Sequence, residues 1–384
     1  MLPSDFSSNS PGRVVRASTG YWAYVPNPLP PPVEVDWTLA EPLAEASRRL
    51  GELAGLTRTL PNPHLLIAPF IRREAVLSSR IEGTRANVSD LARFEALPTR
   101  KAAASMPDVN EVANYVTALE YGLERLKTLP MGLRLLREVH GRLMKGVRGD
   151  HATPGEFRRS QNWIGPPGSS LADATYVPPP VDEMKRALGA FENFLRAPST
   201  LPPLVRLAML HQHFEAIHPF LDGNGRVGRL LITLLLCEWQ LLPAPVLYLS
   251  AFFERRREDY YAHLLTVNQH GAWREWILYF LEGVRHESDD AIRRSGRLLD
   301  LRQKYRRKLE AARAPGLSLR IVDQLFEAPA MSVARAAKIL DVTPRSAQLT
   351  IAKLVDAGIL EEATGRKRDR VFVAREILRI LEAQ

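Results

Sequence analysis

The chain has 384 residues, of which 45% are hydrophobic, so it can bury the cores of two or three domains and is not a disordered chain. Its single cysteine, Cys237, excludes a disulfide framework within the chain, as is typical of a cytoplasmic protein. The net charge of +9 fits an anionic partner such as a nucleotide or a nucleic acid, and singles out neither.

The first 35 residues are rich in Ser and Pro, which predicts an extended N-terminal segment over residues 1–35. No charged stretch followed by an apolar one begins the chain, so we expect no export signal. The most apolar run, residues 230–236, stops at Glu238 and is far shorter than the roughly 20 residues that a membrane helix needs. We therefore expect a cytoplasmic protein with no membrane partner.

Apolar residues at helical spacing predict a mainly α-helical fold from residue 39 onward. The first two helices form an N-terminal helical region over residues 36–105, and the second of them ends near Gly83. Further helices are predicted over residues 109–126, 133–147, 181–195, 204–217, 224–240, 255–270 and 273–281. Between them, two short β-prone runs within residues 162–177 flank a Gly/Pro turn and predict an irregular hairpin.

The pattern of polar and apolar residues changes over the last hundred or so residues. Residues 286–314 form a polar, basic helix that we expect to link domains. Helices are then predicted over residues 319–326, 333–340 and 344–357, with Ser332 and Thr343 as N-caps of the last two. Two β-prone runs, residues 358–360 and 371–373, flank a basic segment. This order predicts a winged helix-turn-helix domain over residues 315–384.

Residues 218–229 read His-Pro-Phe-Leu-Asp-Gly-Asn-Gly-Arg-Val-Gly-Arg. Gly223 and Gly225 remove side chains where a backbone approaches a phosphate, and the apolar helix that follows directs its first amides outward. Arg226 and Arg229 are three residues apart, so they project from one side of that helix toward further phosphates. The segment therefore predicts an anion cradle.

Two more side chains in the same segment add chemistry. Asp222 supplies a hard oxygen ligand where Mg²⁺ bridging two phosphates would lie. His218 is the one group in the segment that takes a proton near neutral pH, so it is the natural general base for an attacking hydroxyl. Taken singly, a histidine before proline is usually an ordinary packed residue, and Asp-Gly-Asn-Gly is an ordinary turn. The conjunction at fixed spacing favours the functional interpretation.

The segment matches, at every specified position, the signature of Fic-domain proteins, His-x-Phe-x-Asp/Glu-Gly-Asn-Gly-Arg-x-x-Arg. Residues 154–158 and 162–165, with Tyr260, Tyr261, Trp273 and Trp276, also resemble flanking parts of that fold. The resemblance covers roughly residues 40–285 and implies a helical catalytic core over residues 106–285. It also implies a hairpin flap that aligns a target polypeptide as an added strand, with these residues: Asn162, Trp163, Ile164 and Gly165.

The resemblance also implies a reaction, the transfer of AMP from ATP to a protein hydroxyl. His218 would deprotonate a Ser, Thr or Tyr of the target, and Asp222 would hold Mg²⁺. The α- and β-phosphates would be bound by Gly223, Asn224 and Gly225, and the β- and γ-phosphates by Arg226 and Arg229. In-line attack at the α-phosphorus then expels pyrophosphate. Related Doc-type kinases carry a Lys-bearing sequence in place of Gly225-Arg226, so this chain resembles the nucleotidyl-transferring members.

Residues 78–83, Ser-Ser-Arg-Ile-Glu-Gly, end an apolar-periodic helix. Alone, a glutamate followed by glycine at a helix end is a solvated charge and a C-cap. The six residues nevertheless match the inhibitory pattern of the Fic family, Ser/Thr-x-x-x-Glu-Gly/Asn, which implies that Glu82 pairs with Arg229 and takes the place of the γ-phosphate. Glu82 could also position a water for removal of AMP, so the direction of the reaction stays open.

A second hypothesis makes the chain a DNA-binding transcriptional regulator. Arg345, Gln348 and Lys353 lie on the predicted recognition helix, and the basic segment supplies Arg366, Lys367, Arg368 and Arg370. Seven acidic residues in the same domain leave little excess positive charge: Asp341, Asp356, Glu361, Glu362, Asp369, Glu376 and Glu382. Winged helices also serve as protein-interaction or dimer modules, so a homo-oligomer is a further alternative. The sequence fixes neither the target protein nor the nucleotide base.

Overall fold

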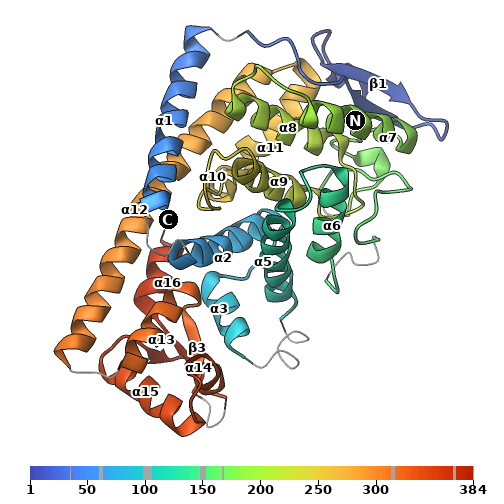
Figure 1. Cartoon of the computed structure of the whole chain (residues 1–384). Coiled ribbons are helices and arrows are strands. Elements are labelled where there is room, and N and C mark those ends of the chain that lie inside the picture. The colour runs from blue at the N-terminus through green and yellow to red at the C-terminus, as the bar shows by residue number, and fades with distance from the viewer. Residues whose placement is uncertain are drawn as a thin grey trace. The chain divides into compact units, whose positions relative to one another are not determined.

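The computed structural model describes residues 1–34, 36–59, 64–97, 106–147, 153–166, 168–312, 316–365 and 369–383 (Figure 1). The chain divides into two compact units. The first comprises Met1–Glu52, Thr117–Leu242 and Leu249–Glu287, and the second Leu53–Val116, Pro243–Tyr248 and Ser288–Gln384. Each unit thus joins segments that are far apart in the sequence. The finer boundaries predicted at residues 36, 106, 286 and 315 stay a prediction.

Helices dominate both units, which confirms the predicted mainly α-helical fold class. The helices that lie wholly in the first unit are α6 (Leu133–Leu143), α7 (Val181–Arg196), α8 (Pro203–Ile217), α9 (Asn224–Glu238), α10 (Ser250–Arg255) and α11 (Arg257–His270). Three helices contribute residues to both units: α1 (Trp37–Thr59), α5 (Pro107–Leu126) and α12 (Trp273–Ala311). The first unit also contains the short 3-10 helices η1 (Pro3–Asp5) and η3 (Leu171–Asp173).

Several predicted helix boundaries differ from the structure, and the helix predicted over residues 133–147 ends at Leu143. The helix predicted over residues 255–270 is preceded by a separate short helix, α10, and the break falls at Arg256, whose backbone leaves the helical region (φ −120°, ψ 46°). The helix predicted over residues 273–281 and the predicted linker helix form one helix, α12, of 39 residues. Polar residues between the two predicted segments interrupted the apolar pattern without ending the helix.

An antiparallel hairpin occupies part of the N-terminal segment that was predicted to be extended. Strand β1 (Gly12–Arg16) pairs with β2 (Trp22–Pro26). The backbone N–H of Tyr24 donates to the carbonyl of Val177 at 2.9 Å, and the Tyr24 side chain is fully buried. The Ser- and Pro-rich composition indicated extended backbone correctly, but it did not reveal that these strands pair and join a core.

Helices α8 and α9 form the centre of the first unit and are buried on almost every face, with polar side chains buried among the apolar ones. They pack against each other, and α8 also packs against α7, α11 and β2. Pro203 begins α8 at a position where its missing N–H costs no hydrogen bond. The short loop between α8 and α9 therefore starts and ends on rigid, buried elements.

The irregular hairpin predicted within residues 162–177 is present as a single β-bridge. Ile164 and Tyr176 form one antiparallel bridge, with N–H to O distances of 2.9 and 3.0 Å. The Tyr176 hydroxyl donates to the carbonyl of Ala216, at the end of α8, at 2.7 Å. This bond attaches the base of the hairpin to the helix that leads into the loop.

The second unit holds α2 (His64–Ile81), α3 (Val88–Ala96) and the C-terminal helices. The latter are α13 (Gly316–Glu327), α14 (Val333–Leu340), α15 (Pro344–Asp356) and α16 (Arg375–Glu382). A three-stranded antiparallel sheet runs in the order β3 (Ala330–Ser332), β5 (Val371–Val373) and β4 (Glu361–Glu362). Helix α2 packs against α13 and α16, so the C-terminal elements share a core with α2.

The predicted N-caps of the C-terminal helices are confirmed. The Ser332 hydroxyl accepts from the N–H of Arg335, and the Thr343 hydroxyl accepts from the N–H of Ser346, both at 3.3 Å. The elements follow the order expected of a winged helix-turn-helix, and that assignment stays a prediction. Within the predicted basic wing, residues 366–368 lie outside the described residues.

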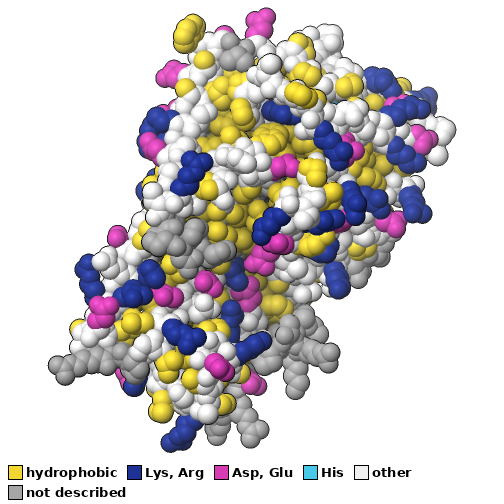
Figure 2. Space-filling model, in the orientation of Figure 1, with side chains coloured by type: hydrophobic (Ala, Val, Ile, Leu, Met, Phe, Trp, Pro, Cys, Tyr) yellow, Lys and Arg dark blue, Asp and Glu magenta, His cyan; other side chains and the backbone are white. Residues whose placement is uncertain are grey.

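Across the described ranges, no helix combines the length and apolar character needed to cross a membrane. Figure 2 shows Lys and Arg side chains interspersed with Asp and Glu over the visible face. The positive net charge is therefore not gathered into one single-sign field on that face.

Candidate active site

The loop between α8 and α9 is bounded by two residues in the left-handed backbone region. His218 caps the C-terminus of α8 with φ 49° and ψ 60°, and its N–H donates to the carbonyl of Phe214 at 3.0 Å. Gly223 is the N-cap of α9 with φ 78° and ψ 7°. Glycine adopts this conformation readily, whereas histidine seldom does. The sharp turns at both ends direct the His218 side chain and the first amides of α9 to the same loop.

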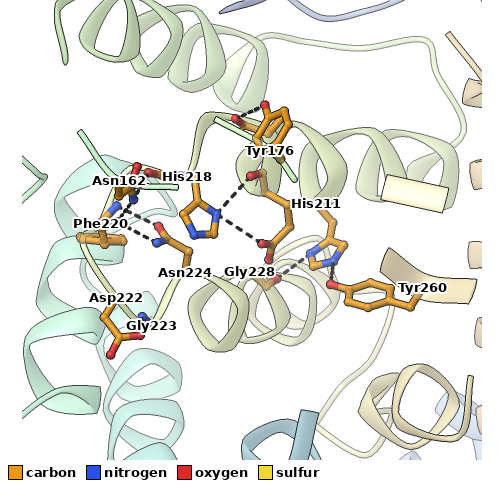
Figure 3. A network of polar contacts seen from close by, with 12 residues as sticks. Asn162, Tyr176, His211, His218, Phe220, Asp222, Gly223, Asn224, Gly228 and Tyr260 are labelled. Carbon is orange, nitrogen blue, oxygen red and sulfur yellow. Dashed lines mark hydrogen bonds and ion pairs between the residues drawn. The ribbon is translucent and has the colours of Figure 1, made fainter. Parts of the chain in front are cut away.

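The imidazole of His218 lies against the last turn of α8 (Figure 3). Its Nδ1 is 3.3 Å from the carbonyl oxygen of Glu215 and 4.0 Å from Oε2 of the same residue. A carbonyl oxygen can only accept, so Nδ1 is the donor in this contact. The neutral tautomer then has its lone pair on Nε2, the atom that a general base uses. The side chain keeps 16% of its surface exposed, which leaves it accessible to a reactant.

A buried arginine outside the motif holds the backbone of this loop. Arg158 is 1% exposed, and its Nε donates to the carbonyl of His218 at 3.0 Å. Its guanidinium also donates to the carbonyls of Ser160 and Pro179, and its own N–H donates to the carbonyl of Pro219. Burial lowers the pKa of Arg158 to about 10, so the side chain stays charged at neutral pH.

Two asparagines complete the support of the loop (Figure 3). The amide of Asn162 donates to the carbonyl of Phe220 at 2.7 Å. Asn224 forms a two-way pair with the same residue: its Oδ1 accepts from the Phe220 N–H and its Nδ2 donates to the Phe220 carbonyl, both at 2.8 Å. The Asn224 side chain is thus used to fix the loop, and only its backbone N–H is directed to what binds at the start of α9.

Asp222 is held by its backbone while its carboxylate stays half exposed, with 50% of the side chain open to solvent. Its Oδ1 accepts from the N–H of Gly223 at 2.6 Å. Its carbonyl oxygen lies 3.1 Å from Nε2 of His140, whose Nδ1 accepts from the N–H of Gly155 at 2.9 Å. Because Nδ1 is an acceptor, Nε2 carries the proton and donates to Asp222.

Burial keeps His140 in this neutral form. Desolvation lowers its pKa to about 4, and the nearby Arg226 acts in the same direction. The ring stacks on Phe220 with centroids 3.8 Å apart and planes 10° from parallel. His140 therefore connects α6, the segment at Gly155 and the loop, and the bond from the N–H of Gly155 requires the neutral ring.

The start of α9 has the properties of an anion site. A side chain at Gly223 would place its Cβ 2.8 Å from Sδ of Met144, so only glycine leaves the backbone accessible at this turn. Arg226 and Arg229 are 4% and 2% exposed, and both lie on the first two turns of α9. Nη2 of Arg226 is 3.9 Å from Oδ1 of Asp222. Two buried cations at a helix N-terminus favour a ligand with several negative charges.

The donor set also fits Mg²⁺. In the part of the chain that the structure describes, no three His, Cys, Asp or Glu side chains cluster as a protein-built metal site. Asp222 offers one half-exposed carboxylate beside the anion site. Mg²⁺ is typically bound by one or two carboxylates together with substrate phosphates and waters, so a single carboxylate here is sufficient.

Comparison with known proteins agrees with this geometry. Residues 40–124 match the Fic/DOC family N-terminal model, and residues 130–236 match the Fic/DOC family model. The second match contains the whole loop and most of α9. The chain belongs to the Fic/DOC family.

Curated Fic relatives are similar over the same region. A protein adenylyltransferase Fic of Drosophila erecta is 29% identical over 206 residues, which cover 52% of this chain and 38% of the relative. The Drosophila yakuba protein of the same name is 28% identical over equal shares of both chains. The match thus spans well under half the length of these curated relatives.

Solved structures show the same fold. A Fic family protein from Desulfovibrio desulfuricans aligns with a TM-score of 0.58 at 18% identity, over 90% of this chain and 98% of that one. Fic-1 from C. elegans aligns with a TM-score of 0.51 at 21% identity, over 66% of this chain and 73% of that one.

The fold brings most of the predicted site residues together. The Fic motif residues and the predicted flap residues all belong to the first unit. The flap residues differ in exposure, because Asn162 is buried beneath the loop while Trp163 and Ile164 are 42% and 38% exposed. A Cβ at Gly165 would lie 2.6 Å from the Ser169 hydroxyl, which would have to rotate away.

Glu82 belongs to the second unit, whereas Arg229 belongs to the first. Glu82 directly follows the last residue of α2 and is exposed, and Gly83 next to it is left-handed with φ 97°. The N–H of Glu82 donates to the carbonyl of Ser79 at 3.0 Å. The local turn is therefore the helix C-cap expected from the sequence, and the pairing of Glu82 with Arg229 stays a prediction.

Sequence reasoning assigned no role to three residues that the Fic fold places around the loop: His140, Arg158 and Gly228. A Cβ on Gly228 would lie 2.2 Å from Oε1 of Glu215, so a larger residue would displace that carboxylate, which lies beside His218. The carbonyl oxygen of Gly228 lies 3.0 Å from Nδ1 of His211. Arg158 and Gly228 lie in segments that the sequence singled out, but the distant contacts that define their roles leave no local pattern.

Proposed function

We propose that this chain transfers AMP from ATP to a Ser, Thr or Tyr hydroxyl of a protein. The observation that carries the proposal is the loop between α8 and α9. It presents an imidazole at one end and a helix N-terminus with two buried arginines at the other. The name protein adenylyltransferase, borne by the Drosophila relatives, supports the same reaction.

In the proposed reaction His218 is the general base. Its Nε2 takes the proton of the target hydroxyl as the hydroxyl oxygen attacks the α-phosphorus of ATP. A bond forms between that oxygen and the α-phosphorus, and the bond from the α-phosphorus to the oxygen bridging to the β-phosphate breaks. Pyrophosphate leaves and AMP stays on the target. With Nδ1 donating to the carbonyl of Glu215, a neutral His218 would carry the lone pair on Nε2, on the other side of the ring.

The start of α9 would bind the triphosphate. The backbone amides of Gly223, Asn224 and Gly225 lie at the positive end of the helix, where phosphate oxygens are favoured. Arg226 and Arg229 would neutralise the β- and γ-phosphates. Bound Mg²⁺ would supply charge neutralisation of the phosphates, and Asp222 is the residue that would hold it.

The flap would hold the target as an added strand. The bridge between Ile164 and Tyr176 leaves Trp163 and Ile164 partly exposed. A polypeptide that pairs through its main chain next to this bridge needs few specific side chains, which suits a site that presents one hydroxyl to His218. The exposed apolar surface of both residues would contact the side chains flanking that hydroxyl.

Glu82 would act as a brake on this reaction. Its carboxylate, paired with Arg229, would take the position of the γ-phosphate and exclude ATP from the productive pose. The support is the match of residues 78–83 to the family's inhibitory pattern and the helix C-cap geometry at Gly83. Removal of AMP from a modified target is the alternative direction for the same site.

Labelled ATP distinguishes these reactions. The full-length chain, Mg²⁺ and a cell lysate are incubated with ATP labelled on the α-phosphorus and, separately, on the γ-phosphorus. AMP transfer places α-label and no γ-label on protein, and His218→Ala is the control for background. Protein labelled from the γ-phosphorus alone would identify a kinase instead. Release of α-label from pre-modified protein, faster with the parent than with His218→Ala, would identify removal as the main direction.

A further inference from the structure

Helix α15 in the second unit has one buried face and one polar, exposed face. Ala347, Thr350, Ile351 and Leu354 are buried beneath it. On the opposite side Arg345, Gln348 and Lys353 are exposed. Among the residues that the structure describes, none of these three side chains has a hydrogen-bond or ion-pair partner. The donors on this face are therefore available to a ligand.

Three acidic residues of the same region are paired with basic side chains outside α15. Glu361 is bound by Arg375 at 2.5 Å, and Glu376 by Lys304 at 2.8 Å. Glu362 lies 3.5 Å from Arg370. On α15 itself the one carboxylate is that of Asp356, the last residue of the helix. These three carboxylates are thus paired with residues outside α15, whereas Asp341, Asp356 and Asp369 stay exposed in the same region.

We infer that the exposed face of α15 binds duplex DNA in the major groove. Arg345 lies in the first turn of the helix and Gln348 in the second, the positions from which a groove-bound helix reaches base edges. Arginine pairs with guanine and glutamine with adenine through two hydrogen bonds each. Lys353, further along the helix, would meet a phosphate.

The exposed Leu349 fits the same occupant. It is 58% exposed and lies between Arg345 and Lys353 on the face. An apolar side chain in the major groove contacts the methyl group of thymine. A second copy of the chain fits less well, because a two-fold pairing centred on Leu349 would bring Arg345 and Lys353 of both copies together. Protein interfaces are depleted of lysine at their centre, so this face favours a polyanion.

The test uses the full-length chain and a fluorescent pool of random 30-base-pair duplexes, with enrichment of bound sequences followed by anisotropy titration of an enriched duplex. We expect affinity that falls with rising salt. Arg345→Ala/Lys353→Ala should lose roughly tenfold or more in affinity and lower the magnitude of the salt slope by about 1 to 2. Arg379→Ala, an exposed arginine on α16, is the matched control and should bind like the parent.

The same assay distinguishes recognition of the DNA sequence from the proposed catalytic activity. Gln348→Ala should relax the enriched sequence at one position while keeping the salt slope. His218→Ala should bind DNA like the parent, so failure of the AMP-transfer proposal leaves this inference intact. Three outcomes would overturn the inference: no enrichment above the starting pool, equal loss with Arg379→Ala, or no DNA binding together with self-association that Leu349→Ser abolishes. The last outcome would assign the face to a protein partner.

Discussion

Nε of Arg158 donates a hydrogen bond to the carbonyl oxygen of His218 at 3.0 Å, from a guanidinium that is 1% exposed. The same side chain also binds the carbonyls of Ser160 and Pro179. It therefore fixes the position of the proposed base without facing the substrate.

Arg158→Lys should reduce the rate of AMP transfer. A lysine keeps the positive charge but cannot reach the same three carbonyls from a planar fork. A shift of the base by about 1 Å costs roughly a hundredfold in rate. We expect kcat to fall by roughly ten- to a hundredfold while KM for ATP changes little. Initial rates over a range of ATP concentrations measure both, and a parental kcat in a folded variant would contradict the positioning role.

His218→Ala should abolish transfer and leave folding and ATP binding largely intact, because the variant loses the base and no phosphate ligand. Label incorporation measures the first property, and thermal unfolding with and without ATP the second. The proposed role of His218 would be wrong if the variant modified targets at the parental rate.

Asp222→Ala should remove activity together with the response to Mg²⁺. The Asp222 carboxylate is half exposed, so its loss leaves little strain in the fold. Titration calorimetry of ATP with and without Mg²⁺ checks the assignment independently of turnover. A variant that stayed active with an unchanged metal requirement would exclude Asp222 as the ligand.

Glu82→Gly should raise AMP incorporation, including self-modification, by roughly tenfold or more, as expected when a close charge pair is removed. Adding Arg229→Ala should cancel the gain, because the released arginine is needed for the phosphates. Initial rates of AMP incorporation by the parent, the single variant and the double variant test whether Glu82 is inhibitory. Equal rates for the parent and Glu82→Gly would reject the brake and leave the catalytic proposal standing.

His140 should make the protein sensitive to acid. Its pKa is about 4 in the folded chain against 6.5 ordinarily, so between these values the unfolded chain binds a proton that the folded chain does not. Stability therefore falls as pH drops below 6.5, and from pH 7 to pH 5 this residue contributes a loss of about 2 kcal/mol. Comparison of the free energy of unfolding at the two pH values for the parent and His140→Gln measures the difference. If His140→Gln lost as much free energy of unfolding between pH 7 and pH 5 as the parent, His140 would not be the source of the acid sensitivity.

The sequence predicted the parts of the site that depend on neighbours along the chain. The motif at residues 218–229 predicted the turn at Gly223 and the helix after it, and the structure confirms both. Ser332 and Thr343 were predicted as N-caps because a cap depends on the three residues that follow it.

The parts that depend on distant residues were not predictable in the same way. Arg158 is 60 residues from His218 in the sequence, and no local pattern shows which carbonyl a buried arginine will bind. The hairpin β1–β2 was missed for a similar reason, since burial of Tyr24 depends on Val177. Asn224 was assigned to phosphate binding by its motif position, whereas its side chain forms two hydrogen bonds with Phe220.

His218 combines a left-handed backbone, which costs folding stability, with the proposed role of general base. A residue with a Cβ costs roughly 1–2 kcal/mol more than glycine in this region, and φ of 49° places His218 there. Glycine at position 218 would relieve that cost and join α8 to the loop with less strain. The backbone at this position thus suits glycine better than histidine, so backbone strain alone does not favour the residue that serves as the proposed base.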